Sequence, residues 1–181
     1  MEFYDVIAAR KSCREYLERP VTEQQLLRVL EAARLAPSWR NFQCWRYIVV
    51  SDRQVIHKLS IVLKNNPSEN AYQCAPYIII LCAYPEESGN MFDKQYYLAD
   101  CGISMEHLCL AASNEGLGTC WVGWFNETGV KNVLDIPEDV RVVALTPLGY
   151  PSGNYKERSR KELSQIVFYN KWGTRSINKG E

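Results

Sequence analysis

Apolar residues recur at three- and four-residue intervals in several stretches of the chain, which is the spacing of one face of an α-helix. This pattern predicts helices over residues 3–9, 22–36, 52–64 and 94–114. Thr22 can cap the second helix, with Gln25 three residues later as its capping-box partner. Pro37 ends that helix, because proline disfavours helical geometry at the residue before it. Asn126 is placed to cap one more short helix.

Short β-branched and apolar runs between these helices predict strands over residues 47–50, 77–82, 119–122 and 140–148. The run 77–82 is apolar at every position, which is typical of a central strand covered on both faces. Two polar stretches, 65–70 and 85–90, predict loops. The pattern mixes helices and strands over one core, but by itself it does not decide whether the sheet is parallel or mixed.

No linker, repeat or low-complexity stretch divides the chain, so residues 1–181 are interpreted as a single domain. Residues 151–181 differ from the rest, because they are polar and weakly periodic with one apolar patch at 166–169. Such a segment buries too little apolar surface to offset the entropy lost on ordering. We therefore expect this tail to pack on the domain or on another subunit.

The composition is that of an ordinary globular protein, with 46% hydrophobic and 23% charged residues. The 21 basic and 21 acidic side chains cancel, so neither nucleic acid nor an anionic membrane is an expected partner. An anion must then be held by a local cluster of cations. The first residues do not resemble a secretory signal, and the longest apolar run, 75–83, is too short to span a bilayer, so a cytoplasmic location is predicted.

The seven cysteines are scattered, odd in number and never in CxxC spacing. This arrangement favours reduced, buried side chains over a disulfide framework. With only His57 and His107 in the chain, we expect no metal site. Neither histidine lies near a nucleophile motif, and no P-loop is present, which disfavours hydrolytic triads and nucleotide hydrolysis.

Two basic segments are candidates for holding an anion. Residues 10–14 place three cations and a hydroxyl within five positions, and arginine can grip a phosphate with a fork of donors. The second run, residues 156–161, contains Arg158 and Arg160. Each run is also compatible with a solvated surface, where cations suit the end of a helix. Together, the two runs would complete a phosphate clamp.

The segment 36–45 is a candidate site for a flat ligand, because it carries three side chains that donate and accept hydrogen bonds, namely Ser38, Asn41 and Gln43. Trp39 and Trp45 flank these groups, and we expect Trp45, which precedes a strand, to lie in the core. In the segment 116–125, glycines permit close backbone approach. That segment is equally compatible with a helix end followed by a core strand. It lacks the third glycine and the preceding strand of a dinucleotide fingerprint, which disfavours a Rossmann site.

Taken in order, these segments resemble the nitroreductase family of FMN enzymes. Residues 10–14 are similar to the family's Arg-x-Ser-x-Arg/Lys, and residues 32–45 to its AARxAPSxxNxQPW. Residues 116–123, 147–151 and the end of the tail complete the resemblance, which spans nearly the whole chain. It implies an α+β fold, with a nitroreductase-like central, mainly antiparallel sheet flanked by helices. It also implies a homodimer in which the C-terminal tails, about residues 151–181, are exchanged between subunits.

The resemblance further implies an FMN-dependent oxidoreductase. Such an enzyme passes hydride from NADH or NADPH to flat, electron-poor acceptors, such as nitroaromatics or quinones, by a ping-pong mechanism. The physiological acceptor, the preferred nicotinamide and the biological importance of nitro reduction are left open. Two alternatives share the fold: a flavin-binding redox sensor that uses the cysteines, and another FMN reductase or dehalogenase activity.

By this resemblance, the phosphate and ribityl end of FMN contacts Arg10, Lys11 and Ser12. Arg14 lies near N1 and O2 of the flavin, where a fixed cation favours the reduced anion. No catalytic side chain beyond the flavin itself is implied.

The resemblance assigns a second group of FMN contacts to the partner subunit, namely Pro37, Ser38 and Asn41, with Trp39 and Gln43 beside them. Backbone near the flavin N5 comes from Trp121, Val122 and Gly123. The tail closes on the phosphate through Arg158 or Arg160, and the resemblance does not decide which.

The chain departs from the family pattern in three places. Cys44 stands where the family usually has proline, and Trp39 and Arg40 are bulky where small residues are common. We expect Trp39 to narrow the ligand pocket. The segment between the strand at 77–82 and the long helix is short, so the lid is expected to be open or formed by the partner. Candidate lid residues are Tyr96, Tyr97 and Trp124.

Overall fold

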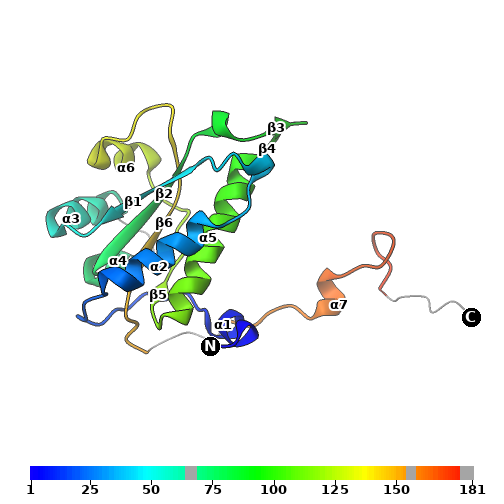
Figure 1. Cartoon of the computed structure of the whole chain (residues 1–181), viewed down its shortest axis with the longest axis horizontal. Coiled ribbons are helices and arrows are strands. Elements are labelled where there is room, and N and C mark those ends of the chain that lie inside the picture. The colour runs from blue at the N-terminus through cyan, green and yellow to red at the C-terminus, as the bar shows by residue number, and fades with distance from the viewer. Residues whose placement is uncertain (64–68, 154–157, 176–181) are drawn as a thin grey trace, which may run out of the picture.

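A four-stranded sheet lies at the centre of the computed structural model, which describes residues 1–63, 69–153 and 158–175 (Figure 1). Its strands are β1 (Trp45–Val50), β2 (Tyr77–Ala83), β5 (Gly118–Thr119) and β6 (Arg141–Gly149). They lie in the order β1-β2-β6-β5, and each neighbouring pair is antiparallel. The mainly antiparallel sheet implied by the resemblance is therefore confirmed.

Helices cover both faces of this sheet. One face packs against α3 (Arg53–Val62), α4 (Glu69–Cys74) and α6 (Glu127–Leu134), and the other against α2 (Glu23–Arg34) and α5 (Tyr96–Asn114). The strand β2 contributes side chains to the cores on both faces of the sheet. Ile78 and Ile80 pack in the core under α3, α4 and α6, and Ile79 and Leu81 pack in the core under α2 and α5. All four side chains are fully buried, so the predicted central strand is confirmed.

Local capping signals determine where several helices start and stop. The first helix, α1 (Phe3–Ala9), has the predicted bounds. Thr22 and Gln25 form the predicted capping box of α2. Asp52 and Asn126 accept backbone N–H bonds at the starts of α3 and α6. Gly116, with φ of +73°, follows the end of α5, in the left-handed conformation that glycine adopts without strain.

The structure differs from the predicted elements between β2 and α5. A turn of 3-10 helix, η2 (Pro85–Glu87), and a hairpin, β3 (Asn90–Met91) with β4 (Lys94–Gln95), occupy this segment, so α5 starts at Tyr96 rather than at residue 94. The hairpin turns at Phe92 and Asp93, both at positive φ. Neither is the glycine or asparagine that usually announces such a turn, so the pattern did not reveal it.

Two further differences are small. The helix α4 begins at Glu69, within the loop expected at 65–70, while residues 65–68 of that stretch lie outside the described residues. The strand expected at 119–122 is only the two residues of β5, and Val122 makes an isolated bridge to Leu145 instead. Tertiary pairing with β6, rather than local propensity, sets the length of this edge strand.

Beyond Pro151 the chain leaves the body, and its described part extends away from the sheet and its helices (Figure 1). It contains one short helix, α7 (Leu163–Ile166), which the sequence pattern did not predict. Leu163, Ile166 and Trp172 on this tail are exposed, Trp172 to 90%. Within the described ranges, no helix is both long enough and apolar enough to cross a membrane.

Candidate functional site

The first basic segment is held beside the edge strand β5. After α1 ends, the backbone N–H of Cys13 donates to the carbonyl oxygen of Thr119 at 2.7 Å. Gly118 permits this approach, because a Cβ built on it would lie 2.7 Å from the Cβ of Cys13. Two candidate segments that are more than a hundred residues apart in sequence are thus joined through their backbones.

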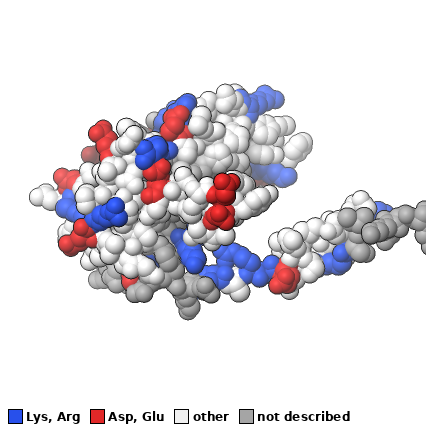
Figure 2. All heavy atoms as spheres, turned by 60° about the horizontal axis from the view of Figure 1, so that its bottom comes forward, with Lys and Arg blue, Asp and Glu red and all other residues white. Residues whose placement is uncertain are grey.

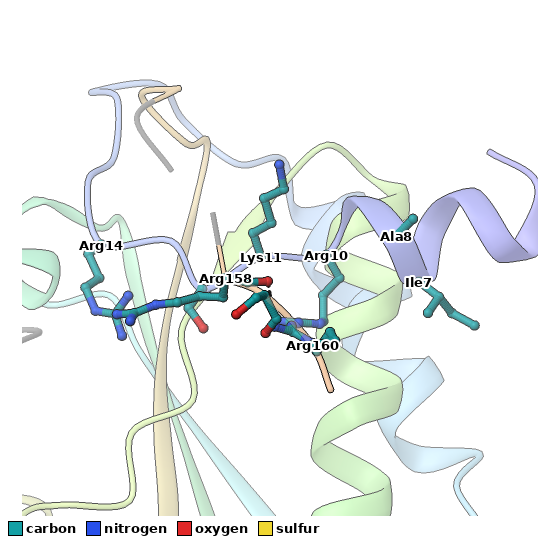
Figure 3. A pocket seen from close by; sticks show the side chains of 9 residues that line it. Ile7, Ala8, Arg10, Lys11, Arg14, Arg158 and Arg160 are labelled. Carbon is teal, nitrogen blue, oxygen red and sulfur yellow. Dashed lines mark hydrogen bonds between the residues drawn. The ribbon is translucent and has the colours of Figure 1, made fainter. Parts of the chain in front are cut away.

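A cavity of about 670 Å³ opens beside this junction, and both predicted basic segments line it. Its lining residues are Ile7, Ala8, Arg10, Lys11, Ser12, Arg14, Arg158, Ser159 and Arg160. In Figure 3 the side chains of Arg14 and Arg158 run toward each other, and Lys11 projects away from them. Figure 2 shows Lys and Arg side chains gathered where the tail leaves the body. Residues 156 and 157 of the second basic run lie outside the described residues.

The charge of the cavity favours an anionic ligand. Five of its lining side chains are cations and none is acidic. Arg10 also forms an ion pair with Glu106 of α5 at 3.5 Å, but that carboxylate is half exposed and lies outside the lining. Like charges gathered in one hollow repel each other unless an anion compensates them. The arginines and the hydroxyls of Ser12 and Ser159 suit a phosphate monoester with a polyol chain, and the volume suits a cofactor-sized ligand.

The second candidate segment lies elsewhere in the subunit. Its short turn of 3-10 helix, η1 (Trp39–Asn41), packs on the start of α5, near the β3–β4 hairpin, whereas α1 lies toward the other end of α5 (Figure 1). Pro37, Ser38, Trp39, Asn41 and Gln43 are therefore absent from the lining of the cationic cavity. Their predicted contact with FMN across a subunit interface stays a prediction.

The side chain of Trp39 packs against Tyr96 and Gly89. Its ring lies 4.3 Å from that of Tyr96, between ring centroids, and it covers Gly89, where a Cβ would approach the indole to 2.6 Å. Trp45 is buried in the core, as expected, and Cys44 is buried with it. Tyr97 is also buried in the core, so it does not line a lid.

The third segment continues from β5 toward the surface. Val122 is buried and exchanges two backbone hydrogen bonds with Leu145, at 2.9 and 3.0 Å. Trp121 and Trp124 on either side of it are exposed. None of Trp121, Val122 and Gly123 lines the cationic cavity, so their predicted approach to the flavin stays a prediction.

None of the seven cysteines, all of which lie in described segments, forms a disulfide; six are buried, whereas Cys74 is exposed. Burial raises the pKa of Cys82 to about 12 and that of Cys109 to about 11, so both thiols are protonated near neutral pH. A protonated, buried thiol reacts slowly with oxidants, because the thiolate is the nucleophile. Among the described residues, no group of three or more His, Cys, Asp or Glu is placed to hold a metal ion.

Asp100 is a polar residue of this region that the sequence pattern did not single out. Asp100 lies in the apolar stripe of α5, and only 4% of its surface is exposed. Its carboxylate accepts hydrogen bonds from the backbone N–H of Trp39 and from the hydroxyl of Ser88. The sequence did contain a signal for this residue, because Asp100 is an acidic residue next to Cys101 in a helix face that the pattern predicts to be buried. Buried acidic residues are rare unless they have polar partners.

Comparisons with known proteins give a consistent result. The family model described as the nitroreductase family matches residues 7–75 and 62–150, which leaves out the tail. One similar protein, from Methanothermobacter thermautotrophicus, is named "Putative NADH dehydrogenase/NAD(P)H nitroreductase". It is 32% identical over 158 residues, which cover 85% of this chain and 80% of that protein.

Solved structures are similar over nearly the whole chain. A nitroreductase family protein from Clostridium novyi NT is 40% identical, covers 96% of both chains and superimposes with a TM-score of 0.81. An FMN-dependent nitroreductase from Clostridium difficile R20291 is 24% identical, with 92% of this chain and 98% of that chain covered and a TM-score of 0.77. At that identity, the second likeness shows the fold alone.

Proposed function

The chain belongs to the nitroreductase family, and from that premise we propose that it is an FMN-dependent oxidoreductase that acts as a homodimer. It passes hydride from NADH or NADPH to flat, electron-poor acceptors, such as nitroaromatics or quinones, in a ping-pong cycle. The observation that carries the proposal is the cavity that five cations from residues 10–14 and 158–160 line. Such a cavity suits the phosphate of FMN.

Each cation has a distinct task in this proposal. Arg10, Lys11 and Ser12 hold the phosphate and the polyol, and Arg158 or Arg160 closes on the phosphate from the tail. Arg14 places a permanent positive charge where negative charge accumulates on reduction of a bound ligand. When bound, FMN supplies the two-electron chemistry, accepting hydride and passing it on. The protein therefore has to bind, orient and polarise, and no nucleophilic side chain is required.

The buried cysteines do not favour the alternative role as a thiol-based sensor. A sensing cysteine needs an accessible thiolate. Six of the seven thiols are buried, and the pKa values of Cys82 and Cys109 are raised by burial. The redox centre of the proposal is accordingly the cofactor, and of the seven thiols only that of Cys74 is exposed.

Two exposed surfaces support the homodimer. On α5, Leu98 is 49% and Ile103 is 40% exposed, and a Cβ on Gly102 between them would meet no atom within 4 Å. The helix is thus apolar on its outer side as well as its inner side, which is the pattern of a helix that packs on both sides. The tail also exposes apolar side chains with no core of its own. We place the interface on α5 and the exchanged tails, so that Pro37, Ser38 and Asn41 contact the FMN of the partner subunit.

The visible absorption spectrum of the purified protein tests this proposal. We expect the absorption of oxidised flavin, bleached in the absence of air by NADH or NADPH, and the faster nucleotide identifies the donor. The Arg158→Ala/Arg160→Ala protein should lose flavin on gel filtration, because two of the five cations are missing. A colourless protein that takes up no added FMN would sink the proposal. Flavin that neither nucleotide bleaches would indicate a binding protein and not a reductase.

A further inference from the structure

A single buried carboxylate joins three segments beside η1. Oδ1 of Asp100 accepts a hydrogen bond from the backbone N–H of Trp39 at 2.8 Å, and Oδ2 accepts one from the hydroxyl of Ser88 at 2.7 Å. The Sγ of Cys44 lies 3.8 Å from Oδ2. The residues before β1, the residues after β2 and the helix α5 therefore meet at one side chain.

This carboxylate is costly for the fold. Moving a carboxylate from water into a protein interior costs on the order of several kcal/mol. Hydrogen bonds or a counter-charge are needed to offset this loss. No cation among the described residues forms a salt bridge with Asp100, and the hydrogen-bond donors that it meets are neutral. A neutral or apolar side chain would fill this place at lower cost, so the fixed geometry of its hydrogen bonds is the useful property.

The segment that Asp100 holds is strained. Arg40 and Gln43 have φ of 47° and 55°, a region that residues other than glycine, asparagine and aspartate seldom adopt, and Asn41 between them has φ of 60°. Each such residue costs about 1 kcal/mol or more and persists only where its surroundings hold it in place. Within the segment, the hydroxyl of Ser38 accepts the backbone N–H of Gln43 at 3.0 Å. The bond from Trp39 to Asp100 ties this closed loop to α5.

From this geometry we infer that Asp100 is a positioning residue, which holds residues 38–43 on α5 so that Ser38 and Asn41 are preorganised for the FMN of the partner subunit. The inference rests on the proposed function. Asp100 lies on the helix whose outer side, with Leu98 and Ile103, forms the proposed interface. A loop that is fixed to this helix is also fixed relative to the partner subunit. The conformational entropy of the loop is therefore lost during folding and not when the cofactor binds.

The test compares Asp100→Ala with two related variants. Asp100→Asn keeps an oxygen for the N–H of Trp39, and its amide can donate to the hydroxyl of Ser88. Ser104→Ala is the matched control, because Ser104 lies one turn later on the same helix and is fully buried. Its hydroxyl bonds the carbonyl oxygen of Ala33 at 2.9 Å and the hydroxyl of Tyr47 at 2.7 Å, not residues 38–43.

The readouts are the Kd for FMN, the thermal midpoint and amide hydrogen exchange of residues 38–43. We expect Asp100→Ala to weaken FMN binding at least tenfold and to speed exchange in residues 38–43. Asp100→Asn should stay within about threefold of the native Kd, a factor that corresponds to less than 1 kcal/mol. Ser104→Ala should lower the thermal midpoint without changing the Kd or the exchange of this segment.

A steric variant tests the same segment from the opposite side. Gly89→Ala would place a Cβ 2.6 Å from the ring of Trp39, so the ring must shift although Asp100 is intact. We expect weaker FMN binding in this variant as well. If Asp100→Ala does not fold, Ser88→Ala removes one hydrogen bond and keeps the charge, and it should raise exchange in residues 38–43 to a smaller degree.

Two results separate the inference from the proposed function. Native exchange rates at residues 38–43 in Asp100→Ala and Ser88→Ala would overturn the positioning role, whether or not the protein binds FMN. Equal losses of FMN affinity in Asp100→Ala and Ser104→Ala would also overturn it, because the effect would then be one of general stability. Failure of the native protein to bind FMN, with faster exchange in the variants, would refute the proposed function and with it the assignment of the loop to a flavin.

Discussion

At the scale of single residues, Arg14 has the most specific task in the proposed reaction. We expect Arg14→Ala to bind FMN at least tenfold more weakly and to lower the midpoint potential of the bound flavin. The reason is the loss of a charge-assisted contact, worth about 1.5–3 kcal/mol, and of the positive charge that stabilises the reduced form. Spectroelectrochemical titration measures the potential, and fluorescence titration measures the Kd.

Two variants separate the charge of Arg14 from other effects. Arg14→Lys keeps the charge and should retain most of the native potential. Arg19→Ala removes a cation that lies over the ring of Tyr150, outside the cationic cavity, and it should change neither quantity. A native midpoint potential in Arg14→Ala would contradict the assigned role.

The lowered pKa of Glu127 makes the stability of the fold depend on pH. Two hydrogen bonds from the guanidinium of Arg141, each of 2.9 Å, and one of 2.8 Å from the backbone N–H of Val142 hold the pKa of Glu127 below its usual value. The folded state therefore favours the charged form. This contribution to stability is complete above the pKa of the unfolded chain and is lost as the pH falls through the lower, folded pKa.

We expect Glu127→Gln to reduce the free energy of unfolding at pH 7 by about 1–2 kcal/mol, a range that allows for partial solvent screening. The difference from the native protein should shrink as the pH falls below about 4.5, where the unfolded carboxylate becomes protonated. Urea denaturation over a pH series measures it. Glu86→Gln, at an exposed carboxylate of η2, is the control. A difference that stays constant down to acid pH would contradict the linkage.

At the scale of elements, the contact of residues 10–14 with β5 shapes the cavity. Gly118→Ala would place its Cβ 2.7 Å from the Cβ and 2.9 Å from the Sγ of Cys13, so the two backbones must separate. We expect a loss of about 1–3 kcal/mol in the free energy of unfolding, as for other overpacked sites, together with weaker FMN binding. Denaturant unfolding and fluorescence titration measure the two effects.

A double variant isolates the steric cause. Cys13→Gly removes the Cβ and the Sγ of Cys13, the two atoms that would clash with a Cβ on Gly118, and leaves the Cβ of Pro151 at an ordinary contact distance of 3.5 Å. In combination with Gly118→Ala, it should recover part of the lost stability, giving a favourable coupling energy in the double-mutant cycle. Additive losses would show that the contact between these two positions is not the cause.

At the scale of the whole molecule, the proposed dimer depends on the outer side of α5. We expect Leu98→Glu/Ile103→Glu to yield a monomer in analytical ultracentrifugation and to weaken FMN binding, because two charges would have to be buried in an apolar interface. Ile61→Glu is the matched control, since Ile61 is an exposed apolar residue on α3, in the other helical layer. It should leave the dimer intact, and a native protein that sediments as a monomer would contradict the proposed assembly.

Much of the local structure follows from the sequence, because neighbouring residues determine it. The capping box of Thr22 and Gln25, the caps at Asp52 and Asn126, and the apolar run in β2 were all predictable from short-range chemistry. The resemblance to a family added the antiparallel sheet, which periodicity alone left open. The basic character of residues 10–14 was also visible without any structure.

Only the tertiary structure decided which segments share a site. It brought residues 10–14 together with Arg158 and Arg160 in one cavity and placed residues 38–43 outside it, on the start of α5. It also revealed the hairpin turning at Phe92 and the bonds of Asp100 to Trp39 and Ser88. These features depend on contacts between residues far apart along the chain, where packing overrides the local preferences that a sequence pattern records.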